Sequence, residues 1–209
     1  MDTFFGEETI NYAIVQESVS QLLEAMAAQL HQQLNSSEIS IQYKVSEFDS
    51  HTVPDIQLSD YLHRIASLSK CTNRDFISAL VYIDRLINNE VISGISFFNV
   101  HRLIAVSIMI STKFYMDKPR LNKRWAKIIG ISLRELNSIE INFLMSINYN
   151  LRIELSVLSA WYDLIFRFSS QASSQNSNTA ANSNCDQNSS ELNEIADEGT
   201  HQAKLSVDL

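Results

Sequence analysis

The sequence predicts an all-α protein, and three observations support this. The chain has 209 residues but only 4 Gly and 2 Pro, whereas folds with many tight turns usually need more of both. Apolar residues recur at helical spacing in successive segments. The segment 99–113 is apolar on nearly every side, which indicates a helix surrounded by other helices.

Composition limits the classes of function. Hydrophobic residues make up 45% of the chain, enough for a sizeable core, and the net charge is −8. Nucleic-acid binders usually carry the opposite charge because they neutralise phosphates, so we expect no nucleic-acid partner. Cys71 and Cys185 lie far apart and form neither a metal-binding nor a disulfide pattern, which favours a reducing compartment. The N-terminus lacks the features of a secretory signal.

The first part of the chain predicts a helix and a connection. A helix over 7–34 is indicated by an apolar stripe of Val15, Val19, Leu22, Met26 and Leu30. Residues 35–53 form a connection, in which alternation over 39–45 is also compatible with a short extended piece. We expect Phe48 to anchor this connection to the core.

Two capping boxes predict the next two helices. Thr52 and Asp55 have the spacing of the first box, with Pro54 inside the first turn. Thr72 and Asp75 form the second. The residues expected to face inward are Leu58, Tyr61, Leu62, Ile65 and Leu68 in the first helix, and Phe76, Ala79, Leu80, Ile83 and Ile87 in the second.

The central helix is expected at 99–113, after a turn at Ser93-Gly94, and Pro119 breaks the chain beyond it. This segment is too short and too charged for a membrane span. A short helix with Trp125 then ends at Gly130, a favourable C-terminal cap. A third capping box, Ser132 and Glu135, opens a helix whose expected inward residues are Leu133, Leu136, Phe143, Leu144 and Ile147.

The C-terminal part predicts one more amphipathic segment, over 154–168, with Leu155, Leu158, Trp161 and Ile165 inward. From 169 onward Ser, Asn and Gln dominate, which is typical of a disordered tail. We therefore divide the chain into an N-terminal helix and connection (1–47), a central helical domain (48–155), a flanking helix (156–168) and a tail (169–209).

Three stretches of the central domain together resemble a cyclin box. They are Leu80-Val81-Tyr82-Ile83-Asp84-Arg85-Leu86-Ile87, then Asn99-Val100-His101-Arg102-Leu103 running into Ser111-Thr112-Lys113-Phe114, and Glu135 to Leu144 followed by Asn148-Tyr149-Asn150-Leu151. Their order fits the second, third and fifth helices of the box. The phosphate-regulating and plant U-type cyclins, which generally have one box, are the subclass that the sequence resembles.

The resemblance implies a cyclin fold, with five helices around a central buried one. It also implies the function of a regulatory subunit that binds and activates a cyclin-dependent protein kinase, in cell-cycle or phosphate signalling. A cyclin box packs against the regulatory C-helix of the kinase and biases the kinase toward its active state. The expected partner is therefore such a kinase, in the nucleus or the cytoplasm.

The same resemblance points to a kinase contact at Lys113 and Glu140. Cyclins pair the Lys and Glu at these motif positions with each other and with the backbone beside the kinase C-helix. Glu140 also lies beside an apolar stripe, where a carboxylate needs a partner. Phe114 and Asp117 are expected beside them, Asp117 either at the rim of the contact or paired with Lys113. The alternatives are a helix-capping lysine and a solvated glutamate.

Asp84 lies among apolar neighbours, and cyclins often place this residue in a buried ion pair with an arginine of the first helix. The usual position falls near Asp55 here, so we expect Arg64 to substitute. This predicted pair is structural, and its loss is expected to destabilise the fold.

We find no catalytic constellation, no phosphate loop and no metal-ligand spacing around His101, so the sequence predicts no enzyme, cofactor, metal or small-molecule substrate. Two alternatives to a kinase regulator stay open. One is a cyclin-fold adaptor for nucleic acid or transcription factors, which the acidic charge disfavours. The other is a helical scaffold without a kinase partner.

Overall fold

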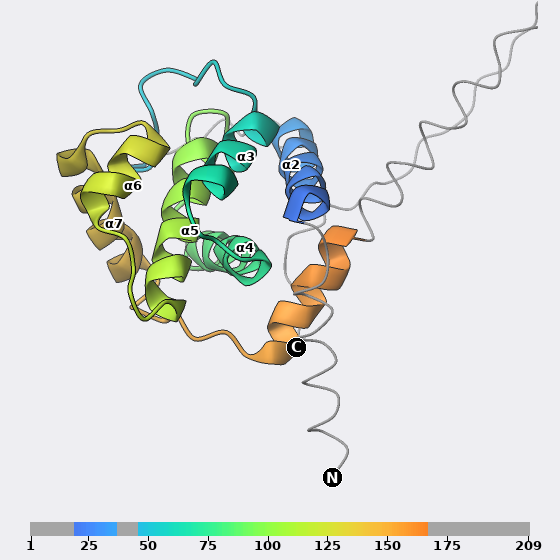
Figure 1. Cartoon of the computed structure of the whole chain (residues 1–209). Coiled ribbons are helices and arrows are strands. Elements are labelled where there is room, and N and C mark those ends of the chain that lie inside the picture. Colours follow the sequence, from blue (N-terminus) through green and yellow to red (C-terminus); the bar gives the residue numbers. More distant parts are fainter. Residues whose placement is uncertain (1–18, 37–45, 167–209) are drawn as a thin grey trace, which may run out of the picture. The chain divides into compact units, whose positions relative to one another are not determined.

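The structure of the chain is a computed structural model that describes residues 19–36 and 46–166, and all regular structure in these residues is helical (Figure 1). The helices are α2 (Val19–Ser36), α3 (Leu58–Leu68), α4 (Asn73–Asn88), α5 (Val100–Tyr115), α6 (Asn122–Ile129), α7 (Leu133–Ser146) and a further helix over 155–166. The predicted all-α class is confirmed. None of the described helices is both long and apolar enough to span a bilayer.

Helix α5 is the centre of the fold, as the sequence predicts. It contacts α3, α4, α6 and α7, and it lies between the pair α6/α7 and helix α3 in Figure 1. Two of its buried hydroxyl groups are satisfied inside the helix. The hydroxyls of Ser107 and Thr112 donate to the carbonyl oxygens of Leu103 and Ile108 one turn back, at 2.7 and 2.8 Å. The helix can therefore be buried all round without unpaired hydroxyl groups there.

The capping box at the start of α4 is confirmed, and it also connects two helices. The backbone N–H and the hydroxyl of Thr72 donate to one carboxylate oxygen of Asp75, at 2.8 and 2.9 Å. The other oxygen accepts from the Ser111 hydroxyl of α5 at 3.0 Å. Asp75 is only 3% exposed, and burial raises the pKa of its carboxyl group. The cap therefore also aligns α4 with α5.

The predicted start of α3 is wrong. Helix α3 begins at Leu58, after a cap residue, Gln57, whose side chain makes no capping bond. Thr52 instead belongs to the connection before the helix, where its carbonyl oxygen accepts from the Ser50 hydroxyl at 2.5 Å. The spacing of Thr52 and Asp55 therefore occurs in a segment that is not helical. Helix α2 packs on α3, and its predicted inward residues Leu22, Met26 and Leu30 are buried.

Both predicted caps around the α6–α7 turn are present. Gly130 follows α6 with φ 89°, a left-handed conformation that glycine adopts without a Cβ penalty. The Ser132 hydroxyl oxygen accepts from the backbone N–H of Glu135 at 3.1 Å. The carboxylate of Glu135, however, pairs with Arg102 of α5, so the Ser132–Glu135 box is only half formed.

Most residues predicted to face inward are buried, and the exceptions lie mainly near helix ends. Val19, Leu68 and Leu133 are 36%, 47% and 41% exposed. Leu68 and Leu133 are the last and the first residue of their helices, where fewer neighbouring helices can cover them. The residues that are only partly buried are Ile87, Leu144 and Leu155.

Phe48 anchors the connection to the core, as predicted. It is 2% exposed, and its ring packs edge-on against Phe143 of α7 with centroids 5.8 Å apart. The helix over 155–166 buries Leu158, Trp161 and Ile165. The predictions for 7–18, 39–45 and the tail from 169 lie outside the described residues, and the predicted domain limits stay predictions.

Candidate partner-binding site

Lys113 and Glu140 form the ion pair that the resemblance to cyclins implies. Lys113 lies in the last turn of α5 and Glu140 in the middle of α7. The Nζ of Lys113 is 2.5 Å from Oε1 of Glu140, and the side chains are 25% and 13% exposed. The pair therefore lies at the boundary between core and solvent. This burial strengthens it relative to a fully exposed pair.

Asn122, the first residue of α6, completes the site. Its Oδ1 accepts from Nζ of Lys113, and its Nδ2 donates to Oε2 of Glu140 at 2.6 Å. The same amide nitrogen donates to Oδ1 of Asn137 at 2.8 Å. One amide thus holds both charged groups in place. The sequence did not predict this residue, because no pattern near Asn122 indicates that it would bond to Lys113 and Glu140 on other helices.

Exposed apolar side chains lie on the same two helices. Phe114, Ile141 and Met145 are 47%, 54% and 58% exposed. Phe114, next to Lys113, packs edge-on against Tyr115 with centroids 4.9 Å apart, and the Arg74 guanidinium lies 4.2 Å above the centre of the Tyr115 ring. Phe114 thus places an exposed aromatic side chain next to a partly buried ion pair, an arrangement typical of protein–protein interfaces.

Asp117 lies in the connection after α5 and is exposed. Among the described residues, Lys113 pairs with Glu140 and not with Asp117. Of the two roles considered for Asp117, the rim of the contact therefore remains the prediction.

The predicted ion pair between Arg64 and Asp84 is wrong. Nη2 of Arg64 in α3 donates to the carbonyl oxygen of Lys127 in α6, at 3.3 Å. Asp84 in α4 accepts from Nδ2 of Asn88, one turn along the same helix, at 2.9 Å. The arginine thus connects α3 to α6, and the carboxylate has only a neutral partner among these contacts. Burial raises the pKa of Asp84 from 3.8 to about 6, and the Asn88 hydrogen bond and the charge of the nearby Arg85 offset only part of this rise.

This environment predicts that Asp84→Asn stabilises the protein near neutral pH. The folded-state pKa lies above the ordinary value, so the folded state binds more protons between roughly pH 4 and 6 and stability falls as pH rises through that range. An asparagine still accepts from Asn88 and carries no charge. Because Asp84 is only partly buried, we expect a gain of about 1 kcal/mol at pH 7 and a flatter dependence of Tm on pH.

Thermal unfolding monitored by circular dichroism at pH 4, 5, 6 and 7 measures this effect. Asp163→Asn, on the exposed face of the helix over 155–166, is the control and should leave the pH dependence unchanged. A lower Tm for Asp84→Asn at pH 7 would contradict the assignment and would restore a stabilising role for the charge.

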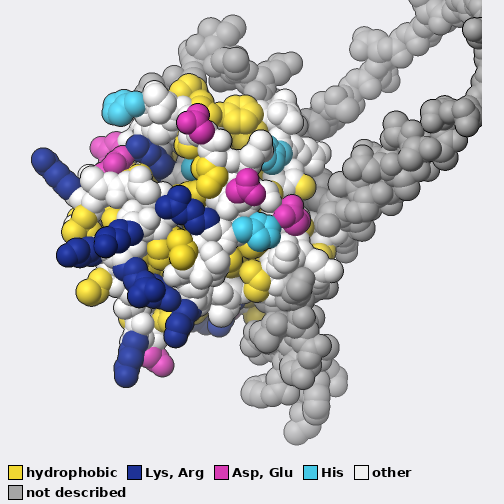
Figure 2. Space-filling view, turned by 45° about the horizontal axis from the view of Figure 1, so that its top comes forward, with side chains coloured by type: hydrophobic (Ala, Val, Ile, Leu, Met, Phe, Trp, Pro, Cys, Tyr) yellow, Lys and Arg dark blue, Asp and Glu magenta, His cyan; other side chains and the backbone are white. Residues whose placement is uncertain are grey.

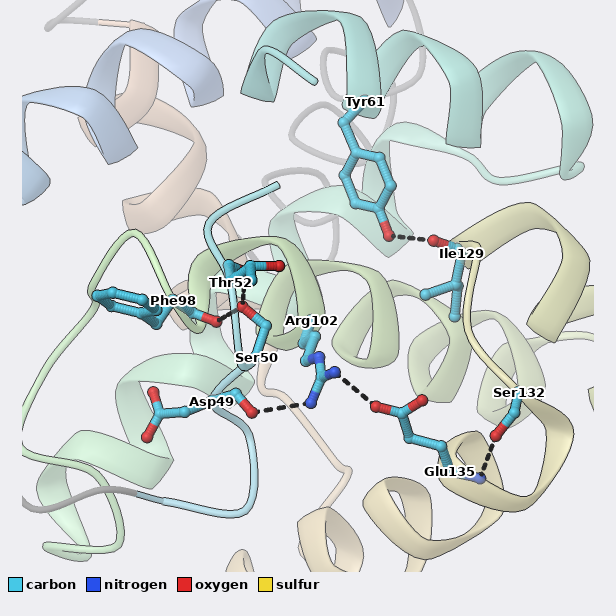
Figure 3. A network of polar contacts seen from close by, with 9 residues as sticks. All are labelled: Asp49, Ser50, Thr52, Tyr61, Phe98, Arg102, Ile129, Ser132 and Glu135. Carbon is cyan, nitrogen blue, oxygen red and sulfur yellow. Dashed lines mark hydrogen bonds and ion pairs between the residues drawn. The ribbon is translucent and has the colours of Figure 1, made fainter. Parts of the chain in front are cut away.

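A second ion pair, not predicted from the sequence, joins three segments around Arg102 of α5 (Figure 3). Its Nη2 lies 2.5 Å from Oε1 of Glu135 in α7, and its Nη1 donates to the carbonyl oxygen of Asp49 at 2.8 Å. The backbone N–H of Ser50 beside it donates to the carbonyl oxygen of Phe98 at 2.8 Å. Arg102 therefore attaches the connection before α3 to helices α5 and α7.

His101, around which the sequence shows no metal-ligand spacing, is a packed residue. Its Nε2 lies 3.0 Å from the carbonyl oxygen of Ile56, and its ring packs edge-on on Tyr61 with centroids 5.2 Å apart. Burial lowers the pKa of His101. The hydroxyl of Tyr61 donates to the carbonyl of Ile129 at 3.1 Å (Figure 3), so these two rings connect α3 to its neighbours.

The comparison with protein families settles what kind of domain carries this site. The sequence profile described as Cyclin matches residues 10–151, more than half of the chain. The chain belongs to the cyclin family. The predicted fold class and the resemblance to phosphate-regulating and U-type cyclins are thereby confirmed. Cyclins are regulatory subunits and not themselves enzymes.

Individual relatives agree with this family. Cyclin-U4-3 of Arabidopsis thaliana is 34% identical over 144 residues, which are 68% of this chain and 66% of the relative. PHO85 cyclin-like protein psl1 of Schizosaccharomyces pombe is 35% identical over 64% of this chain and 55% of the relative. PHO85 cyclin-7 of Saccharomyces cerevisiae is 34% identical over 58% of this chain and 46% of the relative. The chain spans about half to two thirds of the length of these relatives.

Proposed function

We propose that this cyclin binds and activates a cyclin-dependent protein kinase, as a regulatory subunit that contributes no catalytic group. The observation that carries the proposal is the Lys113–Glu140 pair, held by Asn122 and with the exposed Phe114 next to Lys113. Relatives whose names contain PHO85 cyclin support a role in cell-cycle or phosphate signalling. The proposed location is the nucleus or the cytoplasm.

The proposed contact uses the pair as a polar anchor inside an apolar surface. The two charged groups face each other, yet each keeps a partly exposed edge from which it can bond to backbone groups of the kinase at its C-helix. Phe114 supplies apolar area beside them, and Asp117 lies at the rim. Because binding favours one of two kinase states, the burial of this surface supplies the energy for activation. The expected assembly is a heterodimer without nucleic acid or membrane.

The test is capture of a kinase from the native cells by the tagged full chain. The wild type is compared with Lys113→Glu, which places two carboxylates against each other and leaves Asn122 without its cation. The control is Arg152→Glu, because Arg152 is an exposed cation, with 82% of its side chain accessible. Co-purifying proteins are identified by mass spectrometry, and histone-kinase activity is assayed.

We expect a cyclin-dependent kinase with the wild type and the control, and at least a tenfold loss with Lys113→Glu. Circular dichroism on the purified variant separates loss of binding from loss of folding. If no kinase accompanies the wild type, the alternative of a cyclin-fold adaptor or scaffold without a kinase partner takes the place of this proposal.

A further inference from the structure

One segment of this acidic chain is strongly basic. Between residues 118 and 134 six residues are Lys or Arg and none is Asp or Glu, in a chain whose net charge is −8. The six cations are Lys118, Arg120, Lys123, Arg124, Lys127 and Arg134. Figure 2 shows Lys and Arg side chains gathered on one side of the molecule, the side on which α6 lies in Figure 1.

The stability of α6 does not explain these charges. Lys123 and Arg124 lie in the first turn of the helix, which has no acidic residue, and the helix dipole disfavours cations at that end. Lys127, in the last turn, is the one cation on α6 that the dipole favours. Within residues 19–36 and 46–166, none of the six takes part in an ion pair. The positive charge is therefore available to a partner.

The cations of α6 surround a shallow hollow. It has a volume of about 390 Å³ and is lined by Leu121, Lys123, Arg124 and Lys127, which together we name the α6 basic surface. Leu121 is 79% exposed, the largest value among the exposed large hydrophobic side chains described. Burying a leucine side chain contributes about 1.5–3 kcal/mol. A matching ligand thus combines negative groups with one apolar side chain.

We propose that the α6 basic surface binds an acidic peptide segment of a partner protein, with carboxylate or phosphate groups on both sides of one apolar side chain. A nucleic acid matches this surface less well, because the basic segment is short, the whole chain is acidic and the hollow contains a leucine. The surface uses none of the residues assigned to the kinase contact. It would therefore bring a second protein, such as a substrate or a regulator, to the cyclin.

The experiment measures binding of a defined probe to the purified full chain by fluorescence polarisation at low ionic strength. The probe is a fluorescein-labelled peptide of glutamates around a central leucine. The variant is Lys123→Ser/Arg124→Ser, and the matched control is Lys70→Ser/Arg152→Ser. Each double substitution removes one exposed lysine and one exposed arginine, so the variant and the control change the net charge of the chain equally.

We expect the Kd to rise at least tenfold for Lys123→Ser/Arg124→Ser and less than twofold for the control. Leu121→Ser should weaken binding of this peptide and leave binding of an all-glutamate peptide unchanged. Equal losses in variant and control would overturn the proposal, because the attraction would then be non-specific. Tighter binding of a single-stranded oligonucleotide than of the peptide would overturn it as well.

Kinase capture with the same variants keeps this inference separate from the proposed function. Lys123→Ser/Arg124→Ser should still capture the kinase, since Lys113 and Glu140 are unchanged. Loss of the kinase together with the peptide would place the α6 basic surface inside the kinase interface and overturn a separate site. Because the peptide assay needs no kinase, failure of the kinase proposal leaves its outcome unaffected.

Discussion

Exchanging the charges of the central pair, in Lys113→Glu/Glu140→Lys, is expected to restore the fold that Lys113→Glu alone weakens, but not kinase capture. Asn122 explains the restored stability. Its amide offers an oxygen to one partner and an NH₂ group to the other. A half turn of that amide serves the exchanged pair when Asn137, which accepts from the same NH₂ group, turns its own amide as well. Kinase capture is not restored, because the kinase groups that bond to a cation at position 113 and a carboxylate at position 140 would each face the opposite charge.

The expected magnitudes follow from the partial burial of the pair. Removing one member of a buried pair costs about 3–5 kcal/mol, and here exposure reduces this to about 2–3 kcal/mol, or a fall in Tm of about 6–10 °C. The exchanged variant should unfold within about 2 °C of the wild type. Its kinase capture should stay at least tenfold below the wild type, or about 1.4 kcal/mol.

Thermal unfolding and kinase pull-down on the three proteins measure the two quantities independently. If the exchange restored both stability and capture, the pair would act only inside the cyclin, and its proposed contact with the kinase would be wrong. If the exchanged variant recovered neither stability nor kinase capture, Asn122 would not accommodate the exchanged charges as described.

Arg102→Met is expected to destabilise the protein about as much as breaking the central pair. The methionine keeps the aliphatic stem but leaves Glu135 and the carbonyl of Asp49 without their cation. The Arg102 side chain is only 17% exposed, so water replaces these bonds incompletely. We expect a loss of about 2–3 kcal/mol in the free energy of unfolding.

Urea unfolding monitored by tryptophan fluorescence measures this loss. The control is Arg152→Met, because Arg152 pairs with Glu154 at the surface, where the side chains are 82% and 65% exposed. Such a pair contributes little, and its removal should change the free energy by about 0.5 kcal/mol or less. Equal effects of the two substitutions would show that the Arg102 network does not hold the connection in place.

The sequence predicted features that depend on residues close together in the chain. Helical periodicity located α5, and the box of Thr72 and Asp75 located the start of α4, because both arise from bonds within one or two turns. Glycine at 130 marked the end of α6 for the same reason. The same local logic failed at Thr52, where the spacing is present but Ser50 and the backbone of Phe98 hold the chain in another conformation.

The parts of the site that escaped prediction depend on tertiary contacts. Lys113 and Glu140 were found through the resemblance to cyclins, since their spacing alone does not bring them together. Asn122 and the pair of Arg102 with Glu135 had no such guide. Asp84 was assigned a cation that the structure places elsewhere, because the geometry of α3 directs Arg64 to the carbonyl of Lys127.

The amide of Asn122 also has a kinetic consequence. Because it fixes the long side chains of Lys113 and Glu140 within the cyclin itself, their ordering cost, about 0.5–1.5 kcal/mol for each, is met during folding and not during association. A partner thus meets a preorganised anchor, and the encounter needs no rearrangement at this point. Changes at the anchor should then act mainly on the lifetime of a complex, with little effect on how fast it forms.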